Sequence, residues 1–531
     1  MERLCIVALF LAALVLIHPA GNFPLDDDGM YGRPTFEFVR TGHIHMTAVP
    51  TAVRAQLIWG ALFVRLFGES FNVLRAATIV SAVIALLMIN ALLRLTTIPR
   101  GGRIIATLAL AFHPLFLWAS CTFMTEVHFV CASAIAIYCY ARGLREDRVG
   151  FLIAACIAVA VSWWIRQTGV FTAFAALAVV LFRRDGRWKR DATILAMPIA
   201  AFAFVAIFWR STLMGSSAVF DSFLDVWRDP LFHVEDAVAL VYRHTFLPLQ
   251  QMSLWLLPIV AAAAIAVLRK FDWRIVAVAV VMSFGFMMSV SDHLPMPYYG
   301  RSGCCENVAG DIFMNFGLGP PTTYDVFTGQ QVYPFTLPYD ARIALTLLAT
   351  LAAIVFVTAL IRGARNDVVF LLSIAYCAAH IAGLSLTATY FDRYSLTTAW
   401  PLVIAGAMMA PWHRAAQVRA LVVLAVIAVF GILAVNEYFS WQRARWTAYG
   451  ELRRAGVSVT DIEGGMEAEF MLERPYITDV EYRRLRRKLK LGPKHYMIAF
   501  NGRERWHVIA RHPFSGWLGM HQGVIYTLQK N

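Results

Sequence analysis

The feature that most constrains this chain is a repeated series of apolar windows, each long enough to cross a lipid bilayer. Windows of roughly 15 to 24 residues recur as far as about Asn436, and helices of that length span a hydrocarbon core of about 30 Å. Hydrophobic residues make up 59% of the 531 residues, charged residues make up 15%, and the mean hydropathy is +0.60. Ordinary soluble domains do not have this composition, so the sequence predicts a polytopic membrane protein.

The windows predict an all-α membrane domain over residues 1–436 with about 13 transmembrane helices. They are expected near residues 4–18, 72–95, 104–119, 127–140, 149–165, 170–182, 192–209, 252–268, 275–290, 343–361, 368–386, 395–410 and 420–435. Residues 437–531 are more charged and contain turn signals. We therefore expect a small soluble C-terminal domain of α/β or α+β type.

The net charge of +13 is concentrated in short connections between alternate windows. These basic connections lie near residues 100–103, 142–148, 183–190, 269–274, 362–365 and 414–419. Short loops rich in Lys and Arg stay in the cytoplasm, so the other helix ends and the C-terminal domain are predicted to lie outside. The long first external loop disagrees in part, because it also carries arginines. The excess charge is explained by membrane insertion, and no nucleic-acid motif accompanies it.

The unusual polar residues fall on the predicted outer side. Asp26, Asp27 and Asp28 are consecutive, and adjacent carboxylates repel one another unless a metal, an arginine or a proton relieves them. Glu126, Arg166 and Arg393 are placed at the same rim. Ionisable residues that converge at one rim of a membrane domain indicate a functional site.

Each of these residues also has a structural explanation. An aspartate cluster is typical of a solvated turn. A carboxylate such as Glu126 is favoured in the first turn of a helix by the helix dipole. Arg166 and Arg393 can extend along apolar surface to reach the lipid headgroups.

Several short motifs, taken in chain order, carry a resemblance to a known class. They are PLDDDGMY at 24–31, QLIWGALF at 56–63, HPLF at 113–116, TFMTE at 122–126, RQTG at 166–169 and DRY at 392–394. Together they resemble bacterial membrane glycosyltransferases of the GT-C class, the group that includes protein mannosyltransferases and aminoarabinose transferases. The chain departs from the pattern at Glu126, where relatives commonly carry Asp, and at Met30, where an aromatic residue is usual.

The resemblance implies an inverting sugar transfer from a polyprenyl-phosphate donor to a glycan, lipid or protein acceptor. It places the protein in the bacterial inner membrane, with an active site that faces the periplasm. Asp27 is then expected to be the general base, with Asp28 and Glu126 supporting it or binding a divalent cation, Mg²⁺ or Mn²⁺. Arg166 and Arg393 are expected to bind the donor phosphate.

Two other functions are compatible with the same sequence. A transporter or flippase for a polyprenyl-linked or amphipathic substrate would have a similar number of spans and a similar polar rim. It would also be expected to carry charged residues at mid-membrane and paired broken helices. A catalytically inactive assembly subunit is the third alternative, against which the retained carboxylates argue.

Overall fold

The computed structural model describes residues 1–44, 53–208, 248–269, 338–363, 366–384, 390–468 and 494–531, with a few isolated residues between these ranges. Most of the described chain is helical. The longer helices are α1 (Glu2–Ile17), α4 (Phe71–Arg94), α7 (Thr125–Glu146), α8 (Val149–Trp163), α9 (Phe171–Arg183), α10 (Trp188–Phe208), α14 (Leu257–Leu268), α16 (Tyr339–Arg362), α17 (Val368–Leu384), α18 (Leu396–Met409) and α19 (Arg414–Arg454). The expected span at 275–290 lies outside the described residues apart from isolated positions.

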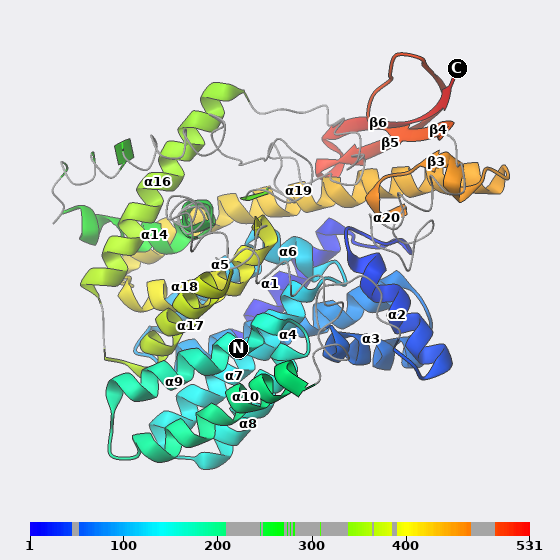
Figure 1. Ribbon diagram of the computed structural model, residues 1–531. Coiled ribbons are helices and arrows are strands. Elements are labelled where there is room, and N and C mark those ends of the chain that lie inside the picture. The colour runs from blue at the N-terminus through cyan, green and yellow to red at the C-terminus, as the bar shows by residue number, and fades with distance from the viewer. Residues whose placement is uncertain are drawn as a thin grey trace, which may run out of the picture.

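The chain is an integral membrane protein. Within the described ranges, four helices are long and apolar enough to cross a membrane, or up to six if each of two bent pairs forms one span. Three shorter apolar helices accompany them. The expected total of about 13 spans therefore stays a prediction. α4 packs against α7, α7 against α8, and α17 against both α9 and α18, so the spans form a connected bundle (Figure 1).

Two of the expected single spans are sharply bent. The span expected at 104–119 consists of α5 (Arg100–Ala111) and α6 (Pro114–Ser120), which meet at 64°. Pro114 explains this break, because proline disfavours helical geometry at the preceding residue and supplies no N–H. The span expected at 252–268 is likewise broken, since the helix Pro248–Trp255 meets α14 at 91°.

The first external loop forms two helices rather than an open loop. They are α2 (Asp28–Thr41) and α3 (Arg54–Phe67), which pack against each other. α3 exposes Ile58, Leu62 and Leu66 while it buries Leu57 and Val64. A helix of 14 residues with this much exposed apolar surface is typical of one that lies along a membrane surface.

α19 is the longest helix and joins the membrane domain to the C-terminal region. Its 41 residues run through the expected domain boundary after Asn436 without a break. Beyond it, β3 (Ile462–Glu463), β4 (Tyr496–Ala499), β5 (Trp506–Gly516) and β6 (His521–Lys530) form a sheet in the order β3-β4-β6-β5. β3 and β4 are parallel, and the other pairs are antiparallel. The sheet lies against α19, and the Ser440 hydroxyl donates to the Ser515 carbonyl at 2.6 Å.

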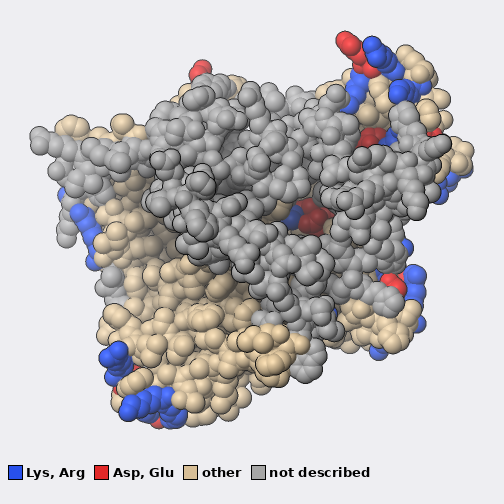
Figure 2. All heavy atoms as spheres, viewed as in Figure 1, with Lys and Arg blue, Asp and Glu red and all other residues tan. Residues whose placement is uncertain are grey.

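The basic connections gather at one end of the bundle. Arg145, in the last turn of α7, donates to Asp367, which lies just before α17. Arg190, in the first turn of α10, donates to Asp147 at 2.6 Å. Figure 1 shows the α9–α10 connection at the lower left and α2 and α3 at the right, and Figure 2 shows Lys and Arg atoms at the same lower-left corner.

The opposite end of α7 carries Glu126 in its first turn. A helix of 22 residues is about 33 Å long, so the basic end and the Glu126 end are separated by about the thickness of a bilayer core.

Candidate active site

The turn between α1 and α2 carries three neighbouring carboxylates and directs one of them away from the other two. Asp26 has a φ of 53°, in the left-handed region, which costs a residue with a Cβ about 1 kcal/mol. Asp27 is the N-cap residue of α2, and Asp28 is its first residue. Asp26 and Asp27 both contact Arg393, whereas Asp28 contacts backbone N–H groups. The turn therefore separates Asp28 from the other two.

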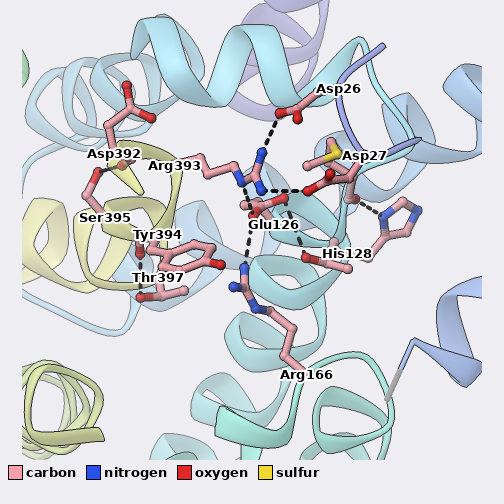
Figure 3. A network of polar contacts seen from close by, with 12 residues as sticks. Asp26, Asp27, Glu126, His128, Arg166, Asp392, Arg393, Tyr394, Ser395 and Thr397 are labelled. Carbon is pink, nitrogen blue, oxygen red and sulfur yellow. Dashed lines mark hydrogen bonds and ion pairs between the residues drawn. The ribbon is translucent and has the colours of Figure 1, made fainter. Parts of the chain in front are cut away.

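Arg393 lies in η4 (Asp392–Ser395) and joins carboxylates from two distant elements. Its guanidinium donates to Asp26 Oδ2 and, at 2.7 Å, to Asp27 Oδ2 (Figure 3). Its Nε lies 3.5 Å from Glu126 Oε1. The Arg393 side chain is only 6% exposed. A guanidinium taken out of water in this way needs charged partners, and these carboxylates supply them.

Arg166 contacts Glu126 from the opposite direction. Its Nη1 donates to Glu126 Oε1 at 3.0 Å, and its guanidinium carbon lies 4.5 Å from the centre of the Tyr394 ring. A cation above an aromatic face at this distance is stabilised by the negative charge density of the ring. Arg166 immediately precedes the short helix η1 (Gln167–Val170), which places its backbone, while Glu126 and Tyr394 hold its guanidinium.

Asp27 is the most exposed of the three carboxylates in this cluster. Its side chain is 23% exposed, compared with 3% for Asp26 and 1% for Glu126. Figure 2 shows acidic and basic atoms together in a recess near the middle of the face. Of the three, Asp27 is thus the carboxylate that an entering substrate hydroxyl can reach.

The cluster carries a small formal negative charge, since three carboxylates face two guanidinium groups. The phenols of the buried Tyr31 and the half-buried Tyr394 lie close enough to the cluster for its charges to act on them. Burial raises the pKa of Tyr31 and of Tyr394, so both phenols stay neutral and keep an O–H donor at physiological pH.

In the described part of the chain, the Asp28 carboxylate contacts backbone N–H groups and none of the arginines of the cluster. Its Oδ1 accepts a hydrogen bond from Leu25 N at 2.5 Å, and its Oδ2 lies 3.5 Å from Phe123 N. Burial raises the pKa of Asp28 to about 8, although Arg75 opposes the shift. Arg75 itself donates to backbone carbonyls of the preceding segment, including Phe23 O at 2.5 Å. Through its contact with Phe123 N, Asp28 therefore links the start of α2 to the turn before α7.

The contacts that the carboxylates of Asp28 and Glu126 make do not fit the expected cation site. Asp28 is held by backbone donors, and Glu126 is held by two arginines. Across the part of the chain that the structure describes, no group of three or more His, Cys, Asp or Glu side chains is arranged to hold a metal.

The structure thus brings together Asp27, Glu126, Arg166 and Arg393, and it leaves Asp28 out. Asp26 was part of the aspartate cluster in the sequence but had no expected role, and it is paired with Arg393. Tyr394 belongs to the DRY motif at 392–394, and the sequence predicts no role for it. Glu467 was not anticipated at all, because it contacts Asp26 from 441 positions along the chain and no local pattern marks it.

Comparison with known proteins gives one family match. Residues 57–209 match the family model described as dolichyl-phosphate-mannose-protein mannosyltransferase. The matched segment contains Glu126 and Arg166, and it ends before Arg393. The match confirms the resemblance to GT-C glycosyltransferases noted in the sequence. No curated protein sequence matches the chain.

Solved structures give looser similarities. ArnT from Cupriavidus metallidurans bound to undecaprenyl phosphate is 14% identical, with a TM-score of 0.42 over 98% of this chain and 97% of that one. The oligosaccharyltransferase AglB from Archaeoglobus fulgidus, in complex with an inhibitory peptide and a dolichol-phosphate, is 12% identical, with a TM-score of 0.42 over 86% and 59% of the two chains. The arabinosyltransferase EmbB from Mycobacterium smegmatis is 14% identical, with a TM-score of 0.32 over 82% and 41%. All of these TM-scores are below 0.5 and describe a loose similarity of chain path.

Proposed function

We propose that this chain, which matches the mannosyltransferase family model over residues 57–209, is an inverting membrane glycosyltransferase. It takes a sugar from a polyprenyl-phosphate donor and transfers it to a glycan, lipid or protein acceptor. The reaction takes place at the outer face of the bacterial inner membrane. The basic connections support this orientation, because they gather at the end of the bundle remote from the site.

The observation that carries the proposal is the accessible Asp27 carboxylate, which pairs with Arg393 in a cluster that also contains Arg166. Sugar transfer from a lipid phosphate needs a base for the acceptor hydroxyl and positive charge for the departing phosphate. Asp27 is partly exposed and is held at 2.7 Å by Arg393, so its carboxylate has a fixed direction. Arg166 lies on the other side of Glu126 in the same cluster.

The two arginines have different surroundings, which supports different roles for them. Arg393 contacts three carboxylates, whereas Arg166 contacts that of Glu126. Both guanidinium groups also lie near the Tyr394 ring, at 4.5 Å for Arg166 and 5.9 Å for Arg393. We assign Arg393 to holding the base and Arg166 to binding the donor phosphate. A guanidinium grips a phosphate well because its N–H groups match two phosphate oxygens.

The proposed step is a single displacement at the anomeric carbon. The acceptor oxygen forms a bond to that carbon while the bond from the carbon to the phosphate oxygen breaks. The hydroxyl proton moves to the Asp27 carboxylate, and the polyprenyl phosphate leaves with the bonding electron pair beside Arg166. Attack from the face opposite the leaving group inverts the anomeric configuration.

Lipid analysis of cells tests this function. Cells that lack the protein are expected to accumulate a polyprenyl-phosphate sugar, detectable by mass spectrometry of extracted lipids, and re-expression of the wild type should remove it. An identical lipid pool in the two strains would contradict the proposal. If the purified protein moves the donor lipid between leaflets of a vesicle and releases no sugar, the transporter alternative is correct.

A further inference from the structure

The C-terminal segment reaches the site through one buried carboxylate. Glu467 lies in α20 (Met466–Ala468), and the residue is 1% exposed. Its Oε1 accepts a hydrogen bond of 3.1 Å from the backbone N–H of Asp26. This contact joins α20 to the turn that carries the proposed base, Asp27.

Arg445 fixes the position of Glu467. Its Nη2 donates to Glu467 Oε2 at 2.9 Å, and the side chains of this ion pair are 1% and 0% exposed. The same guanidinium donates to Gly464 O at 2.9 Å and to Gln442 Oε1 at 3.0 Å. A buried ion pair with this many satisfied donors keeps one geometry. Glu467 is therefore held rigidly by α19.

The backbone at Asp26 needs such support. Its φ of 53° lies in a region that residues with a Cβ rarely adopt, so surrounding contacts must maintain it. The direction of the backbone at Asp26 sets where the next residue, Asp27, begins. Both side chains then meet Arg393. Because Glu467 accepts a hydrogen bond from the Asp26 N–H, it also orients Asp27.

We propose that Glu467 is a positioning residue for the turn at Asp26 and Asp27, so that the C-terminal segment completes the site. This inference rests on the proposed function, in which Asp27 is the base. Displacing a reacting group by about 1 Å can cost about 10²-fold in rate. Among the described residues, Arg166 contacts Glu126 and the Tyr394 ring, which lie outside this segment. Loss of Glu467 should therefore lower kcat and leave the KM for the donor nearly unchanged.

Hydrogen exchange of the Asp26 amide tests the contact without any activity assay. Full-length wild type, Glu467→Ala, Glu467→Gln and a control, Glu463→Gln, are purified in nanodiscs and analysed by exchange mass spectrometry with fragmentation to single amides. Glu463 lies on the same segment and pairs with Lys494 at 3.3 Å, away from the aspartate turn. Exchange at Asp26 should accelerate at least about 10-fold in Glu467→Ala. It should accelerate less in Glu467→Gln, which keeps one of the two acceptor oxygens, and it should stay slow in the control.

Turnover should follow the same order, with a fall in kcat of about 10- to 100-fold for Glu467→Ala and partial rescue by glutamine. If Glu467→Ala fails to fold, Glu467→Asp replaces it, because its arm is one methylene shorter and should show the same faster exchange. Unchanged Asp26 exchange in a folded variant would overturn the proposal. A loss of kcat that is equal in Glu467→Ala and Glu463→Gln would also overturn it. If no sugar is transferred by any form, the exchange result still decides whether Glu467 holds the turn.

Discussion

At the scale of single residues, the site uses arginine in two different environments. Arg393 pairs with three carboxylates, whereas Arg166 pairs with one, and both guanidinium groups lie near aromatic rings. A phosphate that approaches Arg393 must displace bonds to Asp26 or Asp27, whereas Arg166 has fewer bonds to exchange. Donor affinity is therefore expected to depend mainly on Arg166.

Replacing Arg166 by alanine tests this assignment. A hydrogen bond between charged groups contributes about 1.5 to 3 kcal/mol, so the KM for the donor should rise about 10- to 100-fold, with a smaller change in kcat. Donor binding and turnover in nanodiscs give the two values separately. Arg54→Ala is the control, because Arg54 lies over the neighbouring Trp164 ring at 5.7 Å. Equal changes in the two variants would contradict the assignment.

Asp28 predicts a pH dependence of stability. Its pKa is raised to about 8 in the folded protein, from an ordinary value of 3.8. The folded state therefore binds the proton more tightly than the unfolded state. The stabilising contribution is fully present below about pH 4 and is lost as the pH rises through about 8.

Asp28→Asn removes this titration and keeps an acceptor for Leu25 N. Its unfolding temperature relative to the wild type should therefore rise between pH 5 and pH 9. Thermal unfolding in detergent at several pH values measures this, with the exposed Glu504→Gln as control. A difference between Asp28→Asn and the wild type that does not vary with pH would show that Asp28 does not titrate as described.

Site residues are predictable from the sequence where the neighbouring segments show which side of the membrane they face. Asp27, Glu126, Arg166 and Arg393 were predicted to share one rim, because helix ends and loop charges fix which side a residue faces. The divergence of Asp28 from Asp27 follows from the start of α2 between them, because successive residues at a helix start point in different directions. The sequence predicts a loop here and does not mark this helix start.

At the scale of elements, η1 is the support for Arg166. Gly169 within it packs directly on the backbone of the preceding turn. A Cβ at Gly169 would lie 2.4 Å from Trp163 N and 2.6 Å from Ser162 C. These are backbone atoms, so the helix end must shift to admit even a methyl group.

Gly169→Ala should therefore destabilise the protein by about 1 to 3 kcal/mol and lower donor affinity through Arg166. Gly150→Ala is a matched control, because nothing lies within 4 Å of the added carbon and alanine favours helix at that position. Thermal unfolding of both variants provides the measurement. If both variants are as stable as the wild type, η1 does not pack as described.

Helix ends that depend on tertiary packing differ from the ends that the sequence predicts. The existence of most described helices was predictable from apolar windows, because insertion into a bilayer demands them. The continuation of α19 to Arg454 was missed, since its polar second half resembles a soluble segment. That half is helical because the C-terminal sheet and the turn at Gly464 pack against it.

At the scale of the whole molecule, the basic end and the site end are separated by the length of the bundle. Arg187, at the basic end, pairs with Asp147, and its side chain is 52% exposed. Arg40, in α2, is 67% exposed at the opposite end. The proposed orientation places the first inside and the second outside.

Cysteines introduced into a Cys-free variant test the orientation. Arg40→Cys and Glu504→Cys should react with an impermeant maleimide when only the outer membrane is permeabilised. Arg187→Cys should react only after the inner membrane is lysed. The reverse pattern would place the site in the cytoplasm and exclude the proposed reaction at the outer face.

The central claim is that Asp27 accepts the proton of the acceptor hydroxyl, and Asp27→Asn tests it most directly. Asparagine keeps the size of the side chain and accepts no proton. Sugar transfer from a polyprenyl-phosphate sugar pool in nanodiscs should therefore fall about 10²- to 10⁴-fold, with donor binding unchanged. Glu69→Gln, which alters a surface carboxylate paired with Arg40, should transfer sugar at the wild-type rate. Equal rates of transfer by Asp27→Asn and the wild type would contradict the account.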